Sequence, residues 1–171
     1  MGKTAFLVIE LQNDYLWEKR KPKFPYDTEK LIGAVNAAIA DAQGAGADVF
    51  YLAQIFPDTP TNHLVFGFCI EQTEGAKLYA GLDVVSDNYF EKNTADPYLN
   101  PAFAEKMEKG GYDTVLLCGI DEYGSISGAA KAAAQHGMQV TILKSCTATR
   151  FPVNKLIPVR NELKRLGVQY Q

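Results

Sequence analysis

The sequence predicts a three-layer αβα domain built on a doubly wound, mainly parallel sheet of five to six strands. Strand-like and helix-like segments alternate along the chain, which is the pattern of α/β folds. The expected strands are continuous apolar runs, as in strands that helices cover on both faces. The length of 171 residues suits one domain that spans residues 1–171.

The first part of the chain is expected to form a β-α-β unit. An apolar strand at 5–9 ends in Glu10, and Asp27 or Thr28 caps the helix that follows. A second apolar strand lies at 49–53. The connection between two such parallel strands should be a right-handed crossover.

The rest of the chain continues the alternation of strands and helices after a stretch in which apolar residues show no regular spacing. That stretch, residues 55–81, is long for an irregular segment, so it should be functional or hide short helices. The remaining expected elements are a strand at 88–92, a helix at 101–109, a strand at 114–118, an alanine-rich helix at 125–135, a strand at 139–143, a helix with Pro158 in its first turn, and an optional edge strand at 168–170. The common strand order 3-2-1-4-5, extended by a sixth strand if that last segment pairs, makes the first and fourth strands neighbours.

Composition and charge narrow the classes of function. The net charge is −3 and the acidic and basic residues are mixed, so nucleic acid is not an expected partner. No apolar run reaches membrane-spanning length and no secretory signal pattern opens the chain, so we expect a cytoplasmic protein without a membrane partner. The 3 cysteines are widely and irregularly spaced, which fits neither a disulfide framework nor a zinc pattern.

Three polar residues fall where expected strands end. Glu10 follows the first strand, Lys92 closes the third, and Ser125 follows the fourth and opens a helix. The carboxyl ends of parallel strands meet at one edge of the sheet, where α/β folds bind their ligands. A helix N-terminus and a lysine would stabilise the anion of a nucleophile, and a carboxylate would carry its proton. We therefore expect the three side chains to converge in one pocket.

Each of these residues also has an ordinary structural interpretation. Glu10 could be a solvated carboxylate, Lys92 one half of an exposed Glu–Lys pair, and Ser125 an N-cap. Singly, these interpretations are favoured, whereas the joint placement favours a site. The surroundings of Ser125 lack the flanking glycines of a nucleophile elbow, and neither His63 nor His136 is well placed for a Ser-His-Asp triad.

Longer stretches around these residues resemble the isochorismatase-like cysteine hydrolases, the superfamily of isochorismatases, nicotinamidases and N-carbamoylsarcosine amidases. Residues 6–15 (FLVIELQNDY) are similar to the opening strand of that family, which normally ends in a catalytic aspartate. Residues 91–93 (EKN) resemble the segment of its catalytic lysine. Residues 118–133 (CGIDEYGSISGAAKAA) resemble the segment of its nucleophilic cysteine. The matches cover nearly the whole chain in the right order.

The resemblance implies a metal-free, cofactor-free hydrolase of a small molecule, with an amide-like C–N bond as the expected target. Glu10 would act as base and then acid at the aspartate position, Lys92 would stabilise the anion, and Ser125 would stand at the cysteine position. Backbone amides of Asp121 and Ser125 would form the oxyanion hole. A non-proline cis peptide bond is expected near Ile120–Asp121.

Two departures from the family pattern bear on activity. Glu10 replaces an aspartate, and Ser125 replaces the cysteine. A serine hydroxyl is far less acidic than a thiol, so we expect low or absent activity in the chain as written. The alternative is a catalytically silent member that binds a small molecule or a partner protein.

Metal, substrate and self-association are the remaining expectations. Metal-dependent nicotinamidases carry Asp-x-His and a further histidine after the second strand, where this chain offers only Asp58 and His63. A catalytic zinc usually needs three protein ligands, so we expect no metal, which weighs against a nicotinamidase. Family members commonly associate, and residues 64–70 (LVFGFCI) are an apolar candidate for the interface of a homo-oligomer, unless they pack inside the domain. The candidates for lining a substrate pocket, with ordinary packing as an equal alternative, are Trp17, Phe24, Phe56 and Tyr123.

Overall fold

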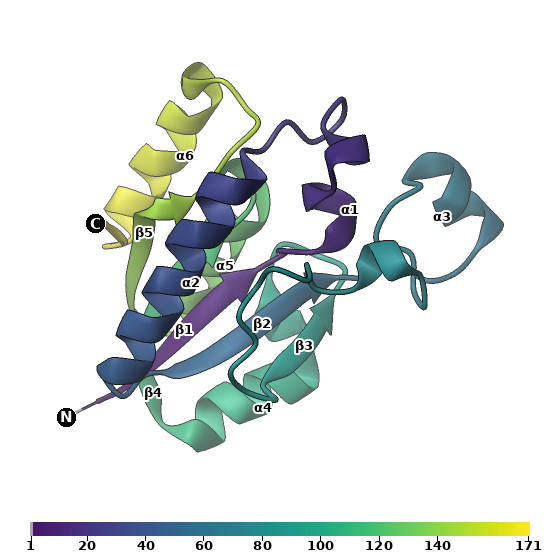
Figure 1. The fold of residues 1–171 in the computed structure, drawn as a ribbon. Helices are drawn as coiled ribbons and strands as arrows, with labels where there is room; N and C mark the ends of the chain where they lie inside the picture. The colour runs from purple at the N-terminus through teal and green to yellow at the C-terminus, as the bar shows by residue number, and fades with distance from the viewer. Residues whose placement is uncertain (1) are drawn as a thin grey trace.

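A six-stranded parallel sheet organises the chain, as seen in a computed structural model that describes residues 2–171 (Figure 1). The strands are β1 (Lys3–Ile9), β2 (Asp48–Gln54), β3 (Tyr89–Lys92), β4 (Tyr112–Gly119), β5 (Gln139–Thr147) and β6 (Gln169–Tyr170). Their order in the sheet is β3-β2-β1-β4-β5-β6, and each neighbouring pair is parallel. This confirms the predicted α/β class and strand order, including the sixth strand.

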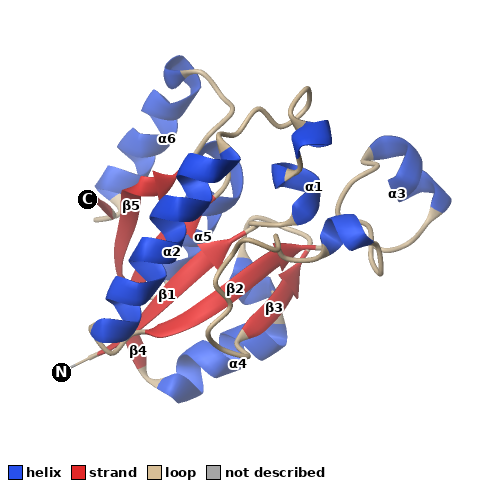
Figure 2. Ribbon diagram, viewed as in Figure 1, coloured by secondary structure: helices blue, strands red, loops and turns tan. Residues whose placement is uncertain are grey.

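Helices cover both faces of this sheet (Figure 2). The helices are α1 (Asn13–Leu16), α2 (Thr28–Gly44), α3 (Pro60–Val65), α4 (Pro101–Gly110), α5 (Ser127–Gln135) and α6 (Val153–Arg165). Side chains of α2 share one hydrophobic core with the sheet, whereas side chains of α4, α5 and α6 belong to the core on the opposite face. No helix within residues 2–171 is both long and apolar enough to cross a membrane.

The central strand β1 explains why its sequence is continuously apolar. Phe6 and Val8 belong to the core under α2, while Leu7 and Ile9 belong to the core under α4 and α5. Successive side chains of a strand point to opposite faces, so a strand covered on both sides needs apolar residues at every position. Each large apolar side chain buried in this way stabilises the fold by about 1.5–3 kcal/mol.

The irregular stretch 55–81 does contain short helices. It holds α3 and a 3₁₀ turn at Glu74–Ala76. A parallel bridge between Phe56 and Ile70 closes the base of the segment that carries α3, and this segment projects from the body of the domain (Figure 1).

The last helix begins earlier than the sequence predicts. Pro158 is the sixth residue of α6 and therefore lies beyond its first turn, and Pro152 is the N-cap. A proline inside a helix removes the hydrogen bond to the carbonyl four residues before it, here that of Asn154. Both Asn154 and Pro158 are exposed, so water can replace the missing bond.

Candidate active site

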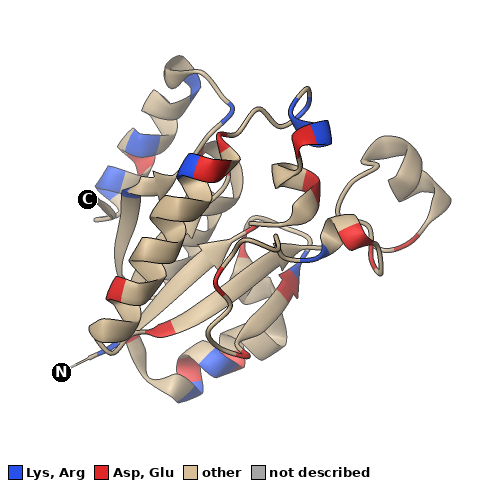
Figure 3. Cartoon of the chain, viewed as in Figure 1, with Lys and Arg blue, Asp and Glu red and all other residues tan. Residues whose placement is uncertain are grey.

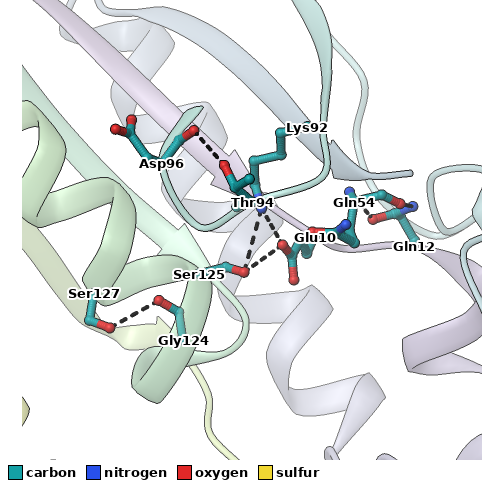
Figure 4. Close-up of polar contacts among 9 residues, drawn as sticks. All are labelled: Glu10, Gln12, Gln54, Lys92, Thr94, Asp96, Gly124, Ser125 and Ser127. Atoms are coloured by element: carbon teal, nitrogen blue, oxygen red, sulfur yellow. Dashed lines mark hydrogen bonds and ion pairs between the residues drawn. The ribbon is translucent and has the colours of Figure 1, made fainter. Parts of the chain in front are cut away.

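Glu10, Lys92 and Ser125 meet at the carboxyl edge of the sheet (Figure 4). Lys92 Nζ forms an ion pair with Glu10 Oε1, and Ser125 Oγ donates a hydrogen bond of 2.5 Å to the same oxygen. Lys92 Nζ lies 3.5 Å from Ser125 Oγ, which closes the triangle. The convergence expected from the strand ends is therefore present in the structure.

Burial of this triangle rules out two of the ordinary interpretations. The exposed fractions of Glu10 and Lys92 are 5% and 6%, so neither is a solvated surface charge. A buried ion pair is costly to break, because removal of one partner leaves the other charge uncompensated. Lys92 Nζ is further held by a hydrogen bond of 3.1 Å to the carbonyl oxygen of Thr94. Ser125 is half-buried and is thus the member of the triangle that a ligand reaches first.

The backbone of Glu10 adopts an unusual conformation. Its φ of 56° lies in the left-handed region, which costs a non-glycine residue about 1–3 kcal/mol. A hydrogen bond of 2.8 Å from Glu10 N to the carbonyl oxygen of Leu52 fixes this conformation at the end of β1. Such strain persists only where the surrounding structure imposes it, and it clusters at functional sites.

Ser125 lies within a π-helical turn that precedes α5. The turn spans Glu122–Ile126, and the side chain of Asp121 caps it by accepting a hydrogen bond of 2.9 Å from Tyr123 N. The helical segment thus begins before Ser125, and the interpretation of Ser125 as an N-cap is wrong. Ser127 Oγ donates to the carbonyl oxygen of Tyr123 at 2.8 Å. It also contacts the carbonyl oxygen of Gly124 at 3.0 Å, as Figure 4 shows. π-Helical turns are rare and often occur at functional sites.

The peptide bond between Ile120 and Asp121 is cis, which confirms the expectation for this position. Most amides of the turn already have acceptors: Glu122 N donates to Ala148, Tyr123 N to the Asp121 side chain, and Gly124 N and Ile126 N to the Asp121 carbonyl. Among the described residues, no acceptor outside the turn binds the amides of Asp121 and Ser125, which are the candidates for holding an oxyanion.

Sequence reasoning missed the role of the Asp121 side chain. Besides the cap, its carboxylate accepts hydrogen bonds of 2.8 Å each from Tyr26 Oη, Thr149 Oγ1 and Arg150 N. These donors come from segments far apart in the chain, so no local pattern marks them. Burial, reinforced by the Asp121 carboxylate, raises the pKa of Tyr26, which keeps the phenol protonated as a donor.

A cavity of about 400 Å³ lies beside Lys92, between β3 and the segment that leads into α4. Its lining includes three carboxylates, which are those of Glu71, Glu91 and Asp96. This side of the site is therefore acidic.

Family membership follows from a comparison with known domains. The family model described as an isochorismatase domain matches residues 4–157. The chain belongs to the isochorismatase family. A curated member, the uncharacterized isochorismatase family protein YddQ of Bacillus subtilis, is 24% identical over 167 residues, which cover 92% of this chain and 86% of that protein.

Solved structures of proteins named as a nicotinamidase/pyrazinamidase, a pyrazinamidase and an N-carbamoylsarcosine amidase share the fold of this chain. The nicotinamidase/pyrazinamidase PncA of Bacillus subtilis matches with a TM-score of 0.84 and 18% identity, covering 98% of each chain. The pyrazinamidase of Pyrococcus horikoshii, solved in complex with zinc, has a TM-score of 0.81 and 20% identity, covering 99% of this chain and 98% of that one. The N-carbamoylsarcosine amidase of Thermoplasma acidophilum has a TM-score of 0.80 and 18% identity, covering 99% and 95%. At these identities the likeness shows the fold alone.

The residues in place of the metal ligands of some isochorismatase relatives are not arranged as a metal centre. His63 Nε2 contacts Asp58 Oδ1 at 2.7 Å, and both side chains are largely exposed. Within residues 2–171, no group of three or more His, Cys, Asp or Glu side chains could hold a metal ion.

The four aromatic candidates for the substrate pocket have different surroundings. Phe24 is buried in the core, with an exposed fraction of 2%. Trp17 and Phe56 are half-buried. Tyr123 is exposed and lies two positions before Ser125. None of the four lines the acidic cavity, so any contact with substrate would be made elsewhere at the mouth of the site.

Proposed function

We propose that this chain carries a metal-free hydrolytic site for a small molecule with an amide-like C–N bond. The observation that supports it best is the single Glu10 oxygen that contacts both Ser125 Oγ and Lys92 Nζ. An oxygen in that position can accept the proton of the nucleophile while the ammonium offsets the developing charge. The relatives named as amidases support the choice of a C–N bond.

In the proposed reaction Glu10 accepts and returns a proton twice, once during acylation and once during hydrolysis of the acyl intermediate. The nucleophile at position 125 attacks the substrate carbonyl carbon, and its proton passes to Glu10. The amides of Asp121 and Ser125 hold the oxyanion while Lys92 stabilises the nucleophile's negative charge. Glu10 then returns the proton to the leaving nitrogen, and the C–N bond breaks. Water attacks the acyl carbon and gives a proton to Glu10, which passes it to the side chain at position 125 as the acyl bond breaks and the carboxylic acid leaves.

A second candidate function is that of a catalytically silent binder, and the identity of the nucleophile favours it. An alcohol normally needs a histidine base, and neither histidine is near Ser125. His136 stacks on Tyr98 with ring centroids 4.1 Å apart, and His63 pairs with Asp58. We therefore propose that the chain as written turns over little.

A thiol introduced at position 125 tests the electrostatics of the site without a substrate. We expect the Ser125→Cys variant to react with iodoacetamide at pH 7 about tenfold faster than the same thiol in denaturant, because Lys92 and the helical turn stabilise the thiolate. A further Lys92→Met change should reverse this gain. The Glu10→Gln change should abolish hydrolysis without slowing alkylation. The measurement is the alkylation rate by mass spectrometry.

The parent protein and the Lys106→Met variant are the controls for that experiment. The parent contains only buried cysteines, Cys69, Cys118 and Cys146, which should react slowly. Circular dichroism checks that each variant is folded, because loss of Lys92 leaves Glu10 unpaired. An alkylation rate that is the same in folded and denatured Ser125→Cys protein would contradict the proposed site.

We also propose that the chain forms a homo-oligomer through residues 64–70. Leu64 and Val65 have exposed fractions of 88% and 62%, whereas Cys69 and Ile70 are buried, so the last two residues of the segment cannot meet a partner. Light scattering at micromolar concentration should give a mass above that of one chain. A Leu64→Asp change should lower this mass, whereas Val84→Asp, at another exposed valine, should not. A monomeric mass for the unchanged protein would refute this proposal.

A further inference from the structure

Glu122 is a buried carboxylate in the π-helical turn that carries Ser125. Its side chain has an exposed fraction of 8%, and it is the first residue of that turn, three positions before Ser125. The triangle of Glu10, Lys92 and Ser125 does not include it. A buried charge that the proposed chemistry does not use therefore lies within the segment that positions the nucleophile.

Arg160 of α6 neutralises this carboxylate with a two-pronged contact. Arg160 Nε donates a hydrogen bond of 2.6 Å to Glu122 Oε1, and Arg160 Nη2 donates one of 2.9 Å to Glu122 Oε2. The guanidinium group is planar and its donors match both carboxylate oxygens, so the contact fixes the orientation of the two side chains as well as cancelling the charge. The hydrogen bond with Glu122 also raises the pKa of Arg160 above its usual value, which keeps the guanidinium charged.

The pair fastens the turn to a different part of the molecule from its neighbour Asp121. The Asp121 carboxylate binds donors from the segments before α2 and after β5, whereas the Glu122 carboxylate binds α6. Figure 3 shows that α6 is rich in basic residues, which are Lys155, Arg160, Lys164 and Arg165. Two consecutive carboxylates thus hold the start of the turn from separate elements.

The other ionisable groups around the turn do not replace Arg160 as the partner of Glu122. Arg160 Cζ lies 5.9 Å from the ring centroid of Tyr170 in β6, and burial raises the pKa of that phenol to about 12, so it is neutral at pH 7. Among the described residues, no other cation forms a salt bridge with Glu122. The remaining ionisable groups near the turn are those of Glu10, Lys92, Cys118, Asp121 and Lys155.

We infer that Glu122 and Arg160 are positioning residues, which hold the turn with position 125 facing Glu10 and Lys92 and keep an uncompensated carboxylate away from the nucleophile. An unpaired carboxylate three positions before the nucleophile would oppose formation of its anion, and the charge of Arg160 cancels that effect. The inference rests on the proposed function for the role of position 125, but a thiol at that position tests it without a substrate.

A double-mutant cycle in the Ser125→Cys protein tests the inference through the pH midpoint of alkylation by iodoacetamide. Arg160→Gln should raise the midpoint by about 0.5–1 pH unit and slow alkylation at pH 7 about three- to tenfold, because it leaves the Glu122 carboxylate unpaired. Glu122→Gln should lower the midpoint by about 0.3 pH unit, because Arg160 then acts on the thiolate without compensation. The double variant should return to within about 0.2 pH unit of the starting midpoint.

Lys131→Gln is the matched control. Lys131 is the only titratable residue of α5, and it forms an exposed ion pair with Glu162 of α6, so this change also removes one cation from a link between the nucleophile segment and α6. It should leave the midpoint within about 0.2 pH unit, since exposed pairs contribute little. Circular dichroism and thermal melting identify the variants that are folded.

Equal midpoints in all four proteins of the cycle would overturn the inference, even if melting temperatures fall, because the pair would then have a purely structural role. A double variant whose midpoint stays as high as that of Arg160→Gln would also overturn it, since Arg160 would act independently of Glu122. If Arg160→Gln does not fold, the comparison of Glu122→Gln with the Ser125→Cys protein decides, and an unchanged or higher midpoint rejects the inference. The cycle measures only differences between variants. It is therefore distinguishable from failure of the proposed function, which would appear as equal alkylation rates in folded and denatured Ser125→Cys protein.

Discussion

The Ser125→Cys variant is expected to hydrolyse a small amide at least about 100-fold faster than the chain as written, which corresponds to roughly 2.7 kcal/mol of activation free energy. A thiol titrates near pH 8.5, and a helical N-terminus together with Lys92 can bring its anion within reach of neutral pH. An alcohol titrates far higher and needs a strong base during attack. Glu10 is close enough at 2.5 Å, but proximity does not raise the basicity of a carboxylate.

The assay compares both forms over a panel of small amides and enol ethers, with and without a carboxylate. Ser127→Cys is the matched control, since Ser127 is buried two positions further on and bonds to backbone carbonyls rather than to Glu10. It should remain as slow as the parent. Equal and robust turnover by the parent and Ser125→Cys would show that serine is a competent nucleophile or that the chemistry lies elsewhere. No turnover by a folded Ser125→Cys protein would favour the silent binder.

A Gly119→Ala change is expected to lower the free energy of unfolding by at least about 3 kcal/mol. Gly119 has a φ of 114°, and a Cβ there would lie 2.1 Å from the carbonyl oxygen of Ile9. That oxygen belongs to the backbone of the neighbouring strand, so it cannot move aside as a side chain would. For a domain of this size, the melting temperature should fall by roughly 6–12 °C.

Gly137→Ala separates the steric clash from the cost of a left-handed backbone. Gly137 has a φ of 80°, but a Cβ there would meet nothing within 4 Å. Its replacement should cost only about 1–2 kcal/mol. Equal losses in the two variants, measured by thermal and urea unfolding, would show that β1 and β4 do not approach as closely as described.

The centre of the sheet was predictable because its strands are buried on both faces. The continuous apolar runs of β1, β2 and β4 leave no polar face, which is typical of a parallel sheet covered by helices. The meeting of Glu10, Lys92 and Ser125 followed from that topology, because all three stand at carboxyl ends of strands. Local sequence patterns therefore predict the sheet and helices well, and they also predict that the site lies at the carboxyl edge of the sheet.

The parts that the sequence did not reveal depend on tertiary contacts. The early start of the turn before α5 depends on Asp121, whose four donors are spread over three segments. The sequence did not reveal the early start of α6, because a proline such as Pro158 usually marks the first turn of a helix. Pro158 is tolerated inside α6 because it is exposed and water can replace the missing hydrogen bond. The apolar run 64–70 divides between surface and core, which composition alone cannot show.

The position of β1 in the sheet has a consequence for synthesis of the chain. β1 emerges from the ribosome first, yet β4, one of its two neighbours, begins only at Tyr112. Until then β1 has an open, apolar edge of the kind that chaperones bind and that aggregates recruit. The carboxylate of Glu10 also lacks its two partners during this time, since Lys92 and Ser125 follow it by 82 and 115 positions. The triangle of Glu10, Lys92 and Ser125 is thus assembled late, because it cannot close before Ser125 has been synthesised.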